Sequence, residues 1–287
     1  MNIDKAGSLG ALTRTAFACS LAWAGAANAL PAITDRLIAS YEFSGDATDT
    51  SGNGNTLFVG GATLAADRFG NPDSAYSFDG VNDYMRTSTA FFDLGAPAYT
   101  INYWLKIDDL YSRYPANIVV NTDPHTGIAI GANHIANPGP RFSYFVGDGL
   151  PGSWAISQGS VAGFKNDLTE GIWYQSTIVK DGGSWQFFVN GLLDATVYGS
   201  LQSSLPATLY FGAAGFLDTW LPEFLPDHFG GSLDDISIYS RALTGSEITT
   251  LYQAEPTAVP APATLPLMLA CAPALAFVAR RKKSSAD

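Results

Sequence analysis

Alternating apolar and polar residues predict a series of β-strands in the middle of the chain. The clearest example runs from Tyr99 to Asp108, where every second residue is apolar. A strand places alternate side chains on opposite faces. The alternation therefore predicts one buried face made of five residues: Tyr99, Ile101, Tyr103, Leu105 and Ile107.

Glycine-containing turns connect the predicted strands into hairpins. Residues 171–190 form two such strands around Asp181-Gly182-Gly183, and Asn190-Gly191 leads into a third strand over Leu192–Val197. Asp79-Gly80 predicts a further hairpin between the segments AYSF and DYMRTS. The segment Leu233–Tyr239 predicts a late strand.

The sequence predicts one short helix at the end of this region. Thr244 precedes Glu247 by three positions, which is the spacing of a capping box. We expect the helix to run to about Tyr252 and to bury Ile248 and Leu251. Many strands without a long amphipathic helix predict an all-β, antiparallel, two-sheet jelly-roll sandwich with this short C-terminal helix.

Composition limits the function of the central region, residues 30–254. It holds nine Lys and Arg against twenty-three Asp and Glu, a net charge of −14, so its surface is poorly suited to bind nucleic acid. Both cysteines, Cys19 and Cys271, lie outside it, so disulfides do not stabilise it. The span is long enough for one sizeable core.

Residues 1–29 have the organisation of a secretory signal peptide. Lys5 and Arg14 precede an apolar run over residues 16–27, and Ala27-Asn28-Ala29 is a suitable cleavage site. The alternative is a membrane anchor, but a run of about a dozen residues is short for a transmembrane helix. We therefore predict export.

Residues 255–287 form a linker and a tail with an apolar helix predicted over 263–279 and a basic end over 280–283. The tail resembles the PEP-CTERM sorting signal of Gram-negative bacteria, except that Ala261 stands where that signal has Glu. The matching positions are Val259, Pro260, Pro262, Arg280 and Arg281. The resemblance implies a transient anchor in the inner membrane, processing by an exosortase, and delivery to the cell envelope, cell surface or extracellular space. A plain C-terminal anchor is the alternative.

The central region resembles the bacterial laminin G-like domains of the concanavalin A-like type. Four segments carry the resemblance in the correct order: 37–55, 75–84, 173–191 and 229–252. The resemblance covers almost all of residues 30–254 and implies the same sandwich fold that the strand pattern predicts.

The composition of the loop DTSGNGN, residues 49–55, allows three interpretations: a flexible linker, a tight turn, or a loop folded around a cation. The resemblance implies a structural calcium ion (Ca2+) held by Asp49, Asn53, Asn55 and Asp234. The chemistry agrees, because calcium prefers carboxylate and carbonyl oxygens. Strand alternation predicts that Asp234 and Asp235 point to opposite faces. The alternative is that Asp49 and Asn53 stabilise a turn while Asp234 accepts backbone hydrogen bonds.

We expect a binding module and not an enzyme. The glutamates of the region are isolated in sequence, whereas related glycoside hydrolases place paired carboxylates on one strand. The candidate carbohydrate-binding side chains lie in loop-like segments, although they could instead close the ends of the core: Tyr111, Tyr114, Trp154 and Trp220. The predicted role is binding of extracellular polysaccharide or another matrix component; the alternatives are a structural or adhesive matrix protein and a divergent glycosidase.

Overall fold

The computed structural model describes most of the central region of the chain. The described residues are 33–87, 91–93, 95–110, 116–120, 128–132, 139–146, 161–162, 167–198, 206–213 and 228–254. The predicted signal peptide, the C-terminal tail and the sorting-signal residues therefore lie outside them. Among the described residues, no helix is both long and apolar enough to cross a membrane.

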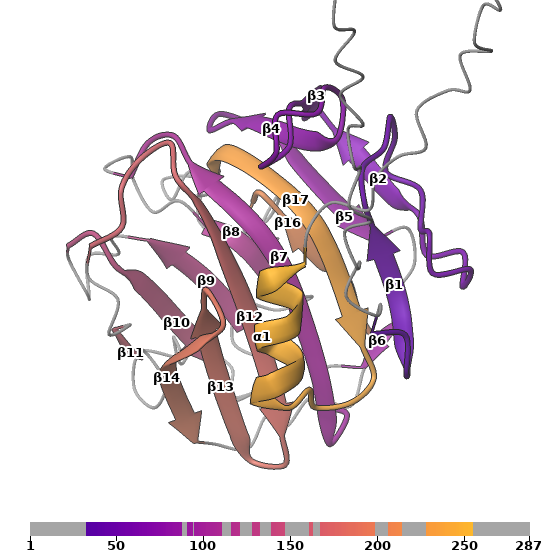
Figure 1. Ribbon diagram of the computed structural model, residues 1–287, viewed down its shortest axis with the longest axis vertical. Coiled ribbons are helices and arrows are strands. Elements are labelled where there is room, and N and C mark those ends of the chain that lie inside the picture. The colour runs from indigo at the N-terminus through magenta and orange to yellow at the C-terminus, as the bar shows by residue number, and fades with distance from the viewer. Residues whose placement is uncertain are drawn as a thin grey trace, which may run out of the picture.

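Two antiparallel sheets face each other in a sandwich (Figure 1). Within the described residues the larger sheet has eight strands in the order β14-β13-β12-β7-β17-β4-β3, and β1 also pairs with β17. Their bounds are β1 Leu37–Tyr41, β3 Thr63–Ala65, β4 Ala75–Asp79, β7 Ala98–Ile107, β12 Trp173–Asp181, β13 Ser184–Val189, β14 Leu192–Tyr198 and β17 Gly230–Tyr239.

The second sheet has seven strands in the described part of the chain, in the order β11-β10-β9-β8-β16-β5-β2. Their bounds are β2 Leu57–Gly60, β5 Tyr84–Thr87, β8 Ala116–Val120, β9 Ile128–Ala132, β10 Phe142–Val146, β11 Val161–Ala162 and β16 Leu209–Phe211. A small pair joins β6 (Phe92–Asp93) to β15 (Pro206–Ala207). The predicted all-β sandwich is confirmed.

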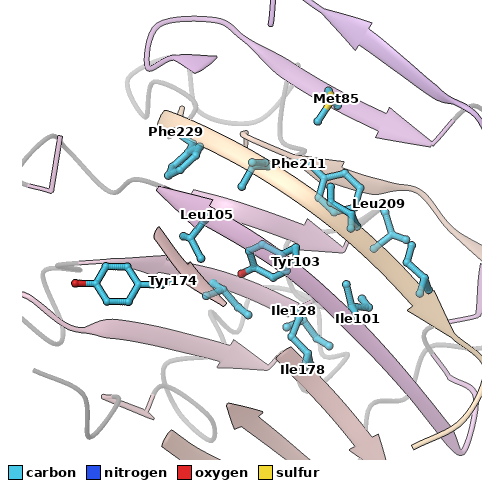
Figure 2. Close-up of a cluster of buried hydrophobic side chains, with 14 of the residues drawn as sticks. Met85, Ile101, Tyr103, Leu105, Ile128, Tyr174, Ile178, Leu209, Phe211 and Phe229 are labelled. Carbon is cyan, nitrogen blue, oxygen red and sulfur yellow. The ribbon is translucent and has the colours of Figure 1, made fainter. Parts of the chain in front are cut away.

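The core lies between the two sheets and receives side chains from both (Figure 2). The five predicted residues on the inner face of β7 are all buried, as the alternation predicts. Figure 2 shows residues of β7 and β12 packing against residues of β5, β9 and β16. The labelled side chains are Met85, Ile101, Tyr103, Leu105, Ile128, Tyr174, Ile178, Leu209, Phe211 and Phe229.

The outer face of the larger sheet is covered by α1, Gly245–Gln253 (Figure 1). Thr244 and Glu247 form the predicted capping box, and Ile248 is fully buried in a second apolar cluster with Val179 of β12. Leu251 packs against the same cluster. The predicted helix is confirmed, with its end one residue beyond the predicted one.

Two hairpin predictions are confirmed and one is wrong. Strand β12 pairs with β13 across Gly182-Gly183, and β13 pairs with β14 across Asn190-Gly191. By contrast, the strands before and after Asp79-Gly80, β4 and β5, belong to different sheets. The turn at Asp79-Gly80 therefore passes the chain from one sheet to the other. A turn sequence shows that the chain reverses, but it does not show which strand each arm will pair with.

Strand β17 pairs with two different strands along one edge. Its first half pairs with β4 up to Leu233, and its second half pairs with β1 from Ile236 onward. Asp234 and Asp235 lie where these two partners separate, so neither strand pairs with them on this edge. The segment between β3 and β4 supplies the side chain that meets them there.

Candidate functional site

Three neighbouring strands of the seven-stranded sheet carry a group of outward-pointing aromatic side chains and one arginine. We call this group the aromatic face; it consists of Phe58 on β2, Tyr84 and Arg86 on β5, and Tyr210 on β16. The strand register places Phe58 opposite Arg86, and Arg86 opposite Tyr210. Their neighbours along the strands are buried in the core: Leu57, Met85, Thr87, Leu209 and Phe211. Alternation therefore places the four side chains together on the outer face.

The rings of the aromatic face are in contact with one another. The ring centroids of Phe58 and Tyr84 lie 6.0 Å apart, and those of Tyr84 and Tyr210 lie 6.3 Å apart. The Arg86 guanidinium carbon lies 4.8 Å from the Phe58 centroid. These distances are in the range of favourable aromatic and cation–π contacts, so the four side chains support each other.

Gly60 is needed for the position of the Tyr84 ring. It lies opposite Tyr84 in the β2–β5 pair. A Cβ atom at Gly60 would come within 2.6 Å of Cε1 of Tyr84. A glycine at this position lets the ring lie directly against the β2 backbone.

The aromatic face combines exposed apolar surface with polar groups that the described part of the fold uses only in part. Phe58 is 46% exposed, which is high for a large apolar side chain. In the part of the chain that the structure describes, the phenol oxygens of Tyr84 and Tyr210 have no hydrogen-bonding partner. Arg86 Nη1 donates to the carbonyl of Thr87 at 3.3 Å. An exposed apolar surface with nearby donors suits a ligand that has both an apolar face and hydroxyl groups.

The loop that predicted a cation site is held to β1 by the Asp49 carboxylate. Asp49 Oδ1 accepts from the backbone N–H of Ser40 at 3.0 Å and of Ser51 at 2.9 Å, and Oδ2 accepts from Asn55 at 2.9 Å. Burial by itself raises the pKa of Asp49, but these hydrogen bonds outweigh it and the pKa is lowered. The carboxylate thus has three backbone donors, as the turn interpretation expects.

Asn53 and Asn55 fasten the same loop to β1. Asn53 Nδ2 donates to the carbonyl of Leu37 at 3.1 Å, and Asn55 Nδ2 donates to that of Ile38 at 2.8 Å. The Tyr41 hydroxyl donates to the backbone carbonyl of Asn55 at 2.6 Å. The loop is therefore stabilised through its amide donors and one of its carbonyls.

Asp234 belongs to a different cluster, built around Arg68. Arg68 Nη1 donates to Asp234 Oδ2 at 2.9 Å and also to the carboxylate of Asp235. The guanidinium lies over the rings of Phe69 and Trp104, at 4.2 and 4.6 Å from their centroids. We call these five residues the Arg68 cluster. It neutralises the buried Asp234 with a cation from the protein itself.

The prediction that Asp234 and Asp235 point to opposite faces is wrong, since both carboxylates reach the same nitrogen of Arg68. Strand β17 has an irregular register between Asp234 and Ser237, and Asp235 has a φ of 43°. This left-handed conformation breaks the alternation. The pKa of Asp234 is raised to about 7; burial is the largest cause, the Asp235 carboxylate also raises it, and Arg68 offsets part of this rise.

The predicted calcium ligands do not form one oxygen cluster as these side chains lie. Asp49, Asn53 and Asn55 come together on β1, but Asp234 is paired with Arg68. No group of three or more His, Cys, Asp or Glu suited to a metal occurs among the described residues. Calcium takes six to eight oxygen ligands, and this arrangement does not fit that requirement. Calcium binding stays a prediction from the sequence.

The predicted carbohydrate-binding residues Tyr111, Tyr114, Trp154 and Trp220 all lie outside the described residues. Sequence reasoning missed the aromatic face instead. A signal was present, because Tyr84 and Arg86 alternate with the apolar Met85 in DYMRTS. Strand pairing was the missing information: β2, β5 and β16 are far apart in sequence and become neighbours only in the sheet.

Two antiparallel sheets packed face to face, with one short helix among the described residues, define the class of protein as an all-β sandwich. Residues 79–249, more than half of the chain, match the laminin G-type family described as the concanavalin A-like lectin/glucanases superfamily, and the chain belongs to this family. The comparison with curated proteins gives no match.

Solved structures share the fold at low sequence identity. Domain 4 of AbnA, a GH43 extracellular arabinanase from Geobacillus stearothermophilus solved with arabinotriose, is 21% identical with a TM-score of 0.57, and the match covers 76% of this chain and 98% of that domain. The binding domain of botulinum neurotoxin serotype D is 18% identical with a TM-score of 0.55, covering 76% and 52%. The binding domain of botulinum neurotoxin DC, solved with SialylT, is 17% identical with a TM-score of 0.54, covering 77% and 52%. This chain therefore spans about half of each toxin binding domain.

Proposed function

We propose that the protein is a non-catalytic carbohydrate-binding module whose aromatic face holds a glycan. The observation that carries this proposal is an aromatic surface on β2, β5 and β16 in which Phe58 is exposed and Tyr84 and Tyr210 are half-buried, with phenol oxygens that have no hydrogen-bonding partner among the described residues. A sugar ring has an apolar face that packs on aromatic rings and hydroxyl groups that hydrogen-bond to polar side chains. Membership of the lectin/glucanase family and the glycan complexes of two fold neighbours support the same reading.

A binding comparison of two variants tests the proposal. Phe58→Ala removes exposed ring surface from the aromatic face, and we expect it to weaken glycan binding at least tenfold. Tyr198→Ala is the matched control, because Tyr198 is an exposed aromatic residue, 75% accessible, on β14 of the other sheet. A glycan array followed by calorimetry measures both. Equal affinity for the two variants would contradict the location of the site, and no saturable binding to any glycan would contradict the function.

A binding role without catalysis agrees with what the described glutamates do. Glu170 Oε1 accepts from the backbone N–H of Leu110 at 2.8 Å, and Glu247 is paired with Arg241. Glu42 is exposed on the loop after β1, and Glu223 lies outside the described residues. We expect no release of reducing ends from any polysaccharide that the protein binds. Release that is abolished by one carboxylate substitution would identify a glycosidase.

We further propose that the module works outside the cytoplasm, after export through the signal peptide over residues 1–29 and processing of the tail by an exosortase. The support is the sequence pattern at the two ends of the chain. Mass spectrometry of the native protein should find an N-terminus close to residue 30 and a C-terminus upstream of the apolar run. A full-length native chain would contradict this part of the proposal.

A further inference from the structure

We infer that the glycan held by the aromatic face is acidic, and that Arg86 binds the carboxylate of a uronic acid residue. This inference rests on the proposed function and adds the chemical class of the ligand. It follows from the position of Arg86 within the aromatic face, from the groups that Arg86 contacts, and from the fact that no described carboxylate pairs with it.

Arg86 occupies the centre of the row across the three strands. Its cross-strand neighbours are Phe58 on one side and Tyr210 on the other, and Tyr84 precedes it by two positions on the same strand face. A sugar ring stacked on any of these rings therefore has its edge within reach of the guanidinium. A uronic acid carries its carboxylate on C5, so a sugar ring stacked with C5 toward Arg86 brings the carboxylate to the guanidinium.

Arg86 has no carboxylate partner among the described residues. Contacts with the Phe58 ring and the Thr87 carbonyl position it, and the Thr87 bond uses Nη1. The other nitrogens of the fork remain available for a ligand. Arg68, the other described arginine that packs on aromatic rings, is paired with two aspartates. An arginine with a structural role in this fold is thus neutralised by carboxylates, whereas Arg86 has no such partner in the described chain.

A planar carboxylate matches the fork of a guanidinium, which forms two parallel hydrogen bonds with it. The aromatic surroundings strengthen this pairing, because they exclude water from one side of the ion pair. The central region as a whole has a net charge of −14, so its overall charge does not favour an acidic polymer. Binding must come from a local contact, and its salt dependence should correspond to about one ion pair.

The experiment compares acidic glycans with neutral forms of the same glycans. Polygalacturonate, alginate and hyaluronan are each measured against their methyl-esterified or carboxyl-reduced counterparts by affinity electrophoresis and calorimetry. We expect the full chain to bind at least one acidic form ten times more tightly than its neutral counterpart. This arm needs no variant, so it does not depend on the folding of a mutant.

Two substitutions assign the effect to Arg86. Arg86→Gln should lose at least ten times more affinity for the acidic form than for its neutral counterpart, and Arg86→Lys should be intermediate. Equal binding of acidic and neutral forms, or an unchanged Arg86→Gln variant, would overturn the inference and leave the proposed function intact, provided that Phe58→Ala still weakens binding. Failure of every glycan to bind would overturn both.

Discussion

Each sheet of the sandwich carries an arginine stacked on aromatic rings, and the two arginines have opposite surroundings. On the larger sheet, Arg68 lies against Phe69 and Trp104, its side chain is only 7% exposed, and it is paired with two aspartates. On the smaller sheet, Arg86 lies over Phe58 at the surface and has no acidic partner in the described chain.

The difference follows from what covers each sheet. The ring of Trp104 stacks on Tyr252 of α1 at 5.7 Å between centroids, so the C-terminal helix and the Arg68 cluster form one continuous layer. Burial there requires the charge of Arg68 to be compensated within the protein. The described residues provide no comparable layer over Phe58. A cation–π contact is thus structural in one place and available for binding in the other.

The largest expected effect is on stability when Arg68 is removed. Arg68→Gln leaves the buried Asp234 without its cation and should lower the free energy of unfolding by about 3 kcal/mol. Arg86→Gln is the control and should change it by less than about 0.5 kcal/mol. Urea unfolding of both variants measures the contrast. Similar losses for the two would mean that both arginines are structural.

A smaller effect concerns the pH dependence of stability. The pKa of Asp234 is raised to about 7, above its ordinary value of 3.8, so the folded state holds a proton that the unfolded state releases. The stabilisation from this group is complete below about pH 4 and is lost as the pH rises past 7. The free energy of unfolding should fall between pH 5 and pH 8, with about 2 kcal/mol of the fall due to Asp234.

Asp234→Asn should remove that part of the fall, because the amide does not titrate. Chemical unfolding at several pH values, on the natural chain and the variant, measures it. The substitution Asp46→Asn serves as a control, since Asp46 is a fully exposed carboxylate on the loop after β1. Parallel pH profiles for the natural chain and Asp234→Asn would show that the Arg68 cluster keeps Asp234 ionised.

The smallest expected effect is that of a chelator. Backbone donors satisfy Asp49 and Arg68 neutralises Asp234, so removal of divalent cations with EDTA should shift the melting temperature by less than about 1 °C, a change of a few tenths of a kcal/mol. Calorimetric scans before and after addition of millimolar Ca2+ measure it. A rise of several degrees with Ca2+ that disappears in Asp49→Asn would instead establish the calcium site that the sequence predicts.

Much of the fold could be predicted from local signals. The inner face of β7, the turns at Gly182-Gly183 and Asn190-Gly191, and the capping box at Thr244 depend on residues close together in sequence. The pairing of strands was harder to predict from the sequence, because the turn at Asp79-Gly80 joins strands of different sheets instead of forming a hairpin. The aromatic face was missed for the same reason, because Phe58 and Tyr210 are separated by most of the domain.

The sequence by itself determined which segments become strands, which of their faces are apolar, and where the one described helix begins. These properties depend on side-chain alternation, turn residues and capping, all of which act over a few positions. Only the tertiary structure decided that Asp234 meets Arg68 and not the 49–55 loop, and that Arg86 lies across from Phe58 and Tyr210 with no carboxylate partner among the described residues. The physical reason is that a charge takes its role from its neighbours, and in a β-sandwich those neighbours come from strands that are distant in the chain.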